Sequence, residues 1–202
     1  MEKVTVPIKE SALPRWTWWA PFLIITMAKV ISLRYFMSDH VAWIYLPYLV
    51  SLPLYFWWGA RVYPQHIVAE MMTANLYGIG DGMVIIFYGL ANATKVFMGY
   101  LLYRQMCATQ ALRSKKGMWN FFFWVLLIQN LIGNFLFLSS YVQTGAYGSE
   151  LFWRLYMINT FKDILEAAIL IYPLLILATP HLRLLGLARN DFLIEEEIKT
   201  VR

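Results

Sequence analysis

The sequence has few charged residues and a single cysteine. Of its 202 residues, 17 are basic, 12 are acidic and 60% are hydrophobic. Cys107 alone cannot form a disulfide within the chain or a metal site built from several thiolates. The longest polar stretches, Arg104–Gly117 and Pro180–Arg202, fall short of the roughly 40 residues that a domain needs to fold unaided. The composition therefore excludes a soluble nucleotide-binding, kinase or cyclase domain within this chain.

Hydrophobic residues instead suffice for about six membrane-spanning helices of roughly 20 residues each. We therefore predict an all-α, polytopic helical bundle over residues 16–179, between an N-terminal segment 1–15 and a C-terminal tail 180–202. Pro47 and Pro53 are expected to kink or break the second span, and Gly78–Gly82 is expected to be a turn. The predicted spans are Trp16–Phe36, Val41–Ala60, Pro64–Ile79, Met83–Tyr103, Trp119–Val142 and Leu151–Thr179.

The positions of the basic residues predict the orientation of these spans. With both termini in the cytoplasm, 12 of the 17 lysines and arginines lie on the cytoplasmic side, as the positive-inside rule requires. We therefore expect a multi-pass protein of the bacterial inner membrane. The net charge of +5 reflects this topology, and the expected surroundings are the lipid bilayer rather than nucleic acid.

Several ionisable and amide side chains lie inside the predicted spans, where they are costly and mark candidate functional sites. Their spacing places several of them on shared helix faces. They can hold the bundle together through hydrogen bonds, or line a wet cavity for a small polar ligand or ion. Charge pairing of Asp163 or Glu166 with Lys95 or Lys29 is expected. The candidate ligand-binding or polar-core residues are Lys29, Glu70, Asn92, Lys95, Asn130, Asn134, Asn159, Asp163 and Glu166.

Other motifs give no sign of catalysis. His40, His66 and His181 are isolated near span ends and are expected to be interfacial, so we predict no metal site and no cofactor. Gly78–Asp81 has the letters of the GxGD element of intramembrane aspartyl proteases, but a second aspartate in a preceding span is missing. We therefore interpret it as a turn and expect a protein that is not an enzyme.

The tail has the pattern of a short amphipathic helix over Asn190–Arg202. Thirteen residues cannot hold such a helix alone in water. We expect it to pack on the bundle, on a second copy of the chain or on a partner protein. The candidate partner-binding residues are Phe192, Ile194, Ile198 and Val201.

Several short motifs follow one another over most of the chain. They are Trp43–Pro47, Gly59–Pro64, Gly89–Lys95, Leu131–Gly133, Phe161–Asp163, Tyr172–Leu174 and Thr179–Pro180. Their order resembles the MASE1 family of bacterial membrane-associated sensor domains, which precede cyclase, phosphodiesterase or kinase output domains. The sequence departs from the family pattern where Tyr48 replaces a glycine and Lys95 replaces an acidic residue.

The resemblance implies a sensory or regulatory membrane module that works without an output domain in this chain. Such a module would sense a ligand, a lipid or a partner and would signal through the C-terminal helix. Two alternatives use the same residues differently. One is a small transporter or channel subunit that moves its substrate along the intramembrane charges, and the other is a non-catalytic membrane subunit that assembles a larger complex.

Overall fold

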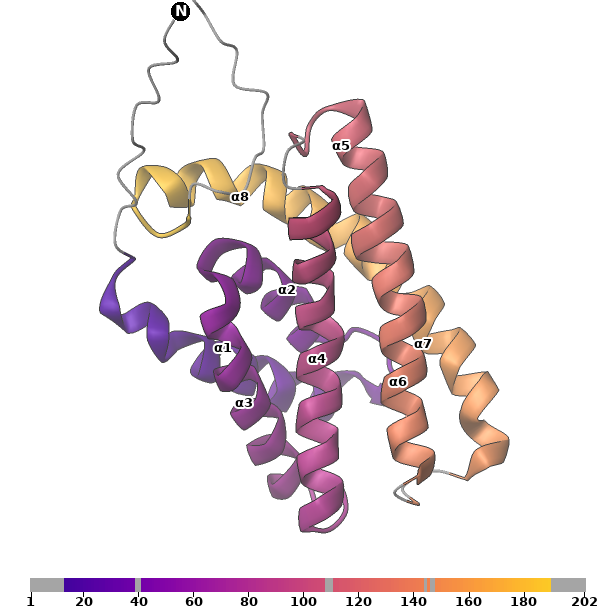
Figure 1. Cartoon of the computed structure of the whole chain (residues 1–202). Coiled ribbons are helices and arrows are strands. Elements are labelled where there is room, and N and C mark those ends of the chain that lie inside the picture. Colours follow the sequence, from indigo (N-terminus) through magenta and orange to yellow (C-terminus); the bar gives the residue numbers. More distant parts are fainter. Residues whose placement is uncertain (1–12, 39–40, 108–110, 144, 146–147, 190–202) are drawn as a thin grey trace, which may run out of the picture.

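The computed structural model describes residues 13–38, 41–107, 111–143, 145 and 148–189, which form a helical bundle (Figure 1). The predicted all-α class is confirmed, since the β structure among these residues is limited to one antiparallel pair of two-residue strands, β1 (Met37–Ser38) with β2 (Val41–Ala42). Within the described part of the chain, two helices are long and apolar enough to cross a membrane. The first is α4 (Gly82–Met106), and the second is the continuous helix of α5 (Lys115–Asn120), the π-helical η4 (Phe121–Ile128) and α6 (Gln129–Gln143).

Helical segments also lie at the other four predicted span positions, but they are shorter or bent. The predicted span Val41–Ala60 is wrong in its extent, because its helix covers only 13 residues, fewer than the roughly 20 needed to cross a bilayer. Val41 and Ala42 belong to β2. Pro47 lies in the first turn of the helix and fixes where the helix begins. Pro53 lies inside the helix without ending it. The N-terminal elements are η1 (Arg15–Trp18), α1 (Ala20–Ile31), the π-helical η2 (Ser32–Phe36), α2 (Leu46–Trp58), η3 (Gly59–Arg61) and α3 (Val62–Leu76).

The last helical segment changes direction within the bundle. After the 3₁₀ turn η5 (Ser149–Leu151), α7 (Phe152–Glu166) continues through the π-helical η6 (Ala167–Ile171) into α8 (Tyr172–Leu184). Figure 1 shows α7 beside α6, whereas α8 lies across the bundle near the end of α4. A π-helical segment followed by a proline is a common cause of such a bend. The helix also continues past Pro180, beyond the predicted end of the span at Thr179.

The bundle is apolar on its surface and partly charged in its interior. The half near α8 has an aromatic core that contains Tyr55, Phe56, Tyr100 and Phe121. Buried polar side chains occupy the region between α1, α3, α4, α6 and α7, and they include Lys29, Glu70, Lys95 and Asp163. Large apolar side chains are exposed on the outside, among them Met27, Leu136, Trp153, Phe161 and Leu177.

Candidate functional site

A cavity of about 720 Å³ lies between α1, α4, α6 and α7. It reaches the connection between α3 and α4, where Gly78 and Gly80 adopt positive φ angles of 65° and 86° that favour glycine. Asp81 then caps α4, since its Oδ1 accepts a hydrogen bond from the backbone N–H of Val84 at 3.2 Å. The predicted turn Gly78–Gly82 is confirmed, and it forms one wall of the cavity.

On one side of the cavity, Lys29 of α1 pairs with Glu70 of α3. The Lys29 Nζ lies 2.9 Å from Glu70 Oε2, and both side chains are at most 1% exposed. Lys29 also donates hydrogen bonds to the hydroxyls of Tyr45 and Tyr88. Asn92 of α4 donates to the same Glu70 oxygen at 3.0 Å, and Tyr45 Oη donates to the other at 3.3 Å. This first cluster therefore joins α1, α3 and α4 and satisfies both charges internally.

His66 belongs to the same cluster, so the prediction that it is interfacial is wrong. It is buried, with its Nε2 3.5 Å from Glu70 Oε1 and its Nδ1 3.3 Å from the hydroxyl of Tyr55. One turn of α3 separates His66 from Glu70, so the two side chains lie on one face. The interfacial position was expected because no other histidine lies one helical turn from His66, and Glu70 was not predicted as its partner.

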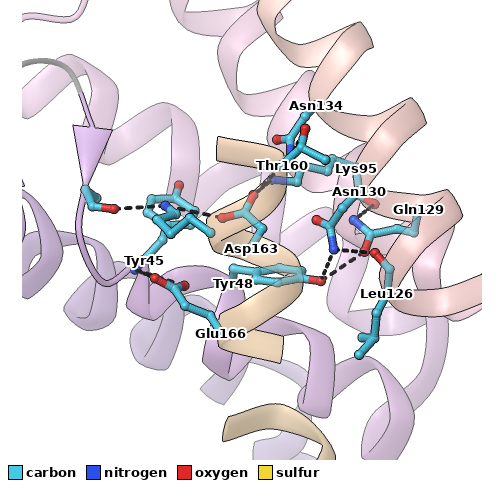
Figure 2. A network of polar contacts seen from close by, with 12 residues as sticks. Tyr45, Tyr48, Lys95, Leu126, Gln129, Asn130, Asn134, Thr160, Asp163 and Glu166 are labelled. Atoms are coloured by element: carbon cyan, nitrogen blue, oxygen red, sulfur yellow. Dashed lines mark hydrogen bonds and ion pairs between the residues drawn. The ribbon is translucent and has the colours of Figure 1, made fainter. Parts of the chain in front are cut away.

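On the other side of the cavity, Asp163 of α7 lies between two lysines. The Lys95 Nζ of α4 is 2.5 Å from Asp163 Oδ2, and the Lys162 Nζ is 3.2 Å from Oδ1. Lys162 also donates to the backbone carbonyl of Ala42 at 2.9 Å, and Asn134 of α6 donates to Asp163 Oδ2 at 3.2 Å (Figure 2). One carboxylate thus connects α4, α6 and α7, and Lys162 adds β2 to this second cluster.

The predicted pairing of Asp163 with Lys95 is confirmed, whereas the pairing expected for Lys29 is wrong. Glu70, and neither Asp163 nor Glu166, neutralises Lys29. Both carboxylate oxygens of Glu166 lie 3.3 Å from the backbone N–H of Tyr45 (Figure 2). Because the Tyr45 side chain belongs to the first cluster, this contact links that cluster to α7, the helix that carries Asp163.

Behind Lys95 lies a layer of hydrogen bonds between α2 and the helix η4–α6. Tyr48 Oη donates to Gln129 Oε1 at 3.0 Å and accepts from Asn130 Nδ2 at 2.9 Å. Gln129 Nε2 donates to the Lys95 backbone carbonyl at 3.0 Å (Figure 2). Tyr48 also packs in the apolar core cluster that contains Tyr55 and Phe121, so this layer connects the backbone of Lys95 to that core.

Most of the candidate residues converge on this region. Glu70, Asn130 and Glu166 lie behind the cavity wall. Sequence reasoning missed Tyr45, Tyr48 and Tyr88, because aromatic residues in a predicted membrane protein are expected at the lipid interface. The candidates that line the cavity are Lys29, Asn92, Lys95, Asn134, Asn159 and Asp163.

The chain that follows α8 is held against the end of α2. Trp58 Nε1 donates to the Leu187 carbonyl at 2.8 Å, and the Arg189 N–H donates to the Trp57 carbonyl at 3.0 Å. Trp57 Nε1 also donates to Thr179 Oγ1 at 2.9 Å. We call these three hydrogen bonds the C-terminal docking contact. The predicted tail residues Phe192, Ile194, Ile198 and Val201 lie outside the described residues.

Among the described residues, no group of three or more histidine, cysteine, aspartate or glutamate side chains is placed to hold a metal ion. Comparison with models of known families, with curated proteins and with solved structures found no match for this chain.

Proposed function

We propose that this protein is a six-span, MASE1-like sensor module of the bacterial inner membrane, with both termini in the cytoplasm and no catalytic activity of its own. The distribution of polarity supports a membrane setting, because charged side chains are buried while large apolar side chains cover the outside. In this orientation the connections α3–α4 and α6–α7 face away from the cytoplasm. The cavity then opens toward the outer side, and the C-terminal docking contact lies on the inner side.

The observation that carries the proposal is the continuity of α7, η6 and α8. Asp163 on α7 is part of the cavity wall, and Glu166 at the end of α7 contacts Tyr45. The same continuous helix ends at the C-terminal docking contact. A change at Asp163 can therefore alter the position of α8 and of the chain that follows it. The MASE1-like pattern in sequence has its aspartate and its proline on this same helix.

We take this cavity as the site of a sensed ligand. The Lys95 side chain lines it, and the Lys95 backbone carbonyl accepts a hydrogen bond from Gln129 of the Tyr48–Gln129–Asn130 layer. Binding shifts the helix only as far as the ligand has different affinities for its two positions.

The proposal is tested by hydrogen exchange in lipid nanodiscs with the variant Asp163→Asn. This variant keeps the side-chain shape but leaves Lys95 and Lys162 without their carboxylate. We expect faster exchange of the amide of Arg189, because its hydrogen bond to Trp57 weakens when α8 moves. Phe161→Leu is the matched control, since Phe161 lies on the same helix but is exposed.

Two variants keep this test informative if Asp163→Asn unfolds the protein. Lys95→Met/Asp163→Asn removes both charges and avoids an uncompensated lysine at Lys95. Trp58→Phe removes the hydrogen bond from Trp58 Nε1 to the Leu187 carbonyl. The exchange rate of the Arg189 amide in this variant is the reference for an opened C-terminal docking contact. Unchanged exchange at Arg189 in the folded double variant would contradict the proposed coupling.

Flux and partner measurements separate the alternatives. Substrate or proton flux through proteoliposomes that is lost in Asp163→Asn would favour a transporter and contradict a sensor. A stoichiometric partner that is retained in Asp163→Asn and lost when residues 190–202 are deleted would favour an assembly subunit. For the sensor we expect no flux and a partner affinity that changes in Asp163→Asn.

A further inference from the structure

The two sides of the cavity differ in their charge balance. Lys29 is matched by Glu70 and by two tyrosine hydroxyls, so this side has no unmatched charge. On the other side Lys95 and Lys162 share the single carboxylate of Asp163. The nearby carboxylate of Glu166 does not line the cavity and lies against the Tyr45 backbone. Among the side chains of α4 and α7 that line the cavity, two lysines therefore face one carboxylate.

Hydrogen-bonding groups without a partner among the described residues lie on the same side of the cavity. Among the described residues, Asp163 is the hydrogen-bond acceptor for the Lys95 ammonium, which has three N–H groups. The side-chain carbonyl oxygen of Asn134 is buried and has no hydrogen-bond partner in the described part of the chain. Asn134 is only 1% exposed and lines the cavity. Buried polar atoms of this kind require a partner.

The remaining walls of the cavity are largely apolar. Leu33, Val84, Phe137 and Leu138 line it, and they come from three different parts of the bundle. A volume of about 720 Å³ lies within the range of pockets that hold small organic ligands. A simple inorganic anion would leave these apolar walls without contacts.

We infer that the cavity binds a monoanionic amphiphile, a molecule with one carboxylate-type head group and an apolar tail. The head group lies at Lys95 and Lys162, and the tail packs against Phe137 and Leu138 of α6. A hydroxyl on the head group, or a water bound with it, donates to the Asn134 carbonyl. This inference rests on the proposed function, because it names the ligand class of the same sensory cavity.

The test uses a decanoate analogue with a photoreactive diazirine at the end of its tail. The protein in nanodiscs is irradiated with this probe, and the labelled residues are mapped by mass spectrometry. We expect labelling of Phe137 and Leu138, which line the cavity, in excess of Ile132 and Phe135. Ile132 and Phe135 are exposed on the same helix and report insertion of the probe into the surrounding lipid.

Competition separates the charge of the head group from the effect of its tail. Octanoate should displace the probe from the cavity residues, whereas octylammonium, with an equal tail and the opposite charge, should not. Labelling confined to Ile132 and Phe135, or equal competition by the two amphiphiles, would overturn the inference. Both results come from the unmodified protein, so they do not depend on the folding of a variant.

Substitutions then locate the head group. Lys162→Gln should reduce cavity labelling about tenfold, the effect of losing one charge-assisted hydrogen bond. Lys162→Arg should retain it, and Lys116→Gln, at an exposed lysine outside the cavity, should leave it unchanged. Full labelling in folded Lys162→Gln would place the head group elsewhere and contradict the inference.

Failure of this inference is distinguishable from failure of the proposed function. The exchange experiment with Asp163→Asn uses no ligand. Absence of specific labelling together with faster Arg189 exchange would reject the amphiphile and keep the coupled sensor. Specific labelling without any change in exchange would support the ligand and reject the coupling to the C-terminal docking contact.

Discussion

Replacing Lys29 by methionine should destabilise the protein more than most single substitutions do. Methionine keeps the side chain as far as the Cε position and removes the ammonium that neutralises Glu70. The pair is at most 1% exposed, and the N–O distance is 2.9 Å. Removing one partner of a buried ion pair costs about 3–5 kcal/mol, because the other charge stays buried without compensation. Glu70 keeps its hydrogen bonds from Asn92 and Tyr45, so we expect a loss of about 3 kcal/mol in the free energy of unfolding.

A double-mutant cycle tests the physical origin of this loss. Glu70→Gln leaves Lys29 unneutralised and should cost a similar amount. Lys29→Met/Glu70→Gln removes both charges, so it should cost no more than either single variant and give a coupling energy of about 3 kcal/mol. The exposed Lys115→Met is the control and should change stability by less than about 0.5 kcal/mol.

The assay is reversible unfolding by sodium dodecyl sulfate in mixed micelles, followed by tryptophan fluorescence. The reasoning would be refuted by additive single effects, or by a cost below about 1 kcal/mol for Lys29→Met, the value typical of an exposed pair. Either result would mean that water reaches this pair in the folded protein.

Three further predictions concern local features. The Cys107 thiol is 1% exposed, and its burial raises its pKa to about 11. Maleimide should therefore react with it slowly at pH 7.5, faster as the pH rises, and at least about tenfold faster after unfolding. Equal rates in the folded and unfolded protein would contradict this burial. Gly133→Ala places a Cβ 2.6 Å from the Lys95 Cγ and should cost about 1–3 kcal/mol in the same unfolding assay. Gly82→Ala, which meets nothing within 4 Å, is its control and should not destabilise the protein. Asp81→Ala removes the cap of α4 and should cost about 1 kcal/mol, whereas Asp81→Asn should retain most of the stability.

The long helices were the part of the fold that the sequence predicted best. Long apolar runs indicate α4 and the helix α5–α6 directly, and both ends of each lie within a few residues of the prediction. The short helix α2 was not predictable from hydropathy, because residues 41–42 are apolar yet pair with residues 37–38. The bend between α7 and α8 is not evident from the sequence, which shows a single long apolar segment at Leu151–Thr179.

The candidate site was predicted in composition and, for Lys95 with Asp163, in pairing, but the partner of Lys29 was not predicted. Spacing along a helix placed Asn92 with Lys95 on one face. Which carboxylate meets Lys29 depends on the packing of α1 against α3, and no local pattern encodes that choice. The i, i+4 spacing of His66 and Glu70 does indicate that these two side chains share one face of α3. The tyrosines that complete the network carry no sequence signal that separates them from interfacial aromatics.

The central claim is that the polar cavity controls the position of the chain after α8, and a distance measurement tests it most directly. Spin labels at Leu184 of α8 and Val68 of α3, both exposed, are introduced into a Cys107→Ala background and measured by pulsed electron paramagnetic resonance in nanodiscs. We predict that Asp163→Asn shifts or broadens the distance distribution, while the exposed substitution Phe161→Leu does not. Identical distributions in the folded Asp163→Asn variant and the parent would contradict the claim.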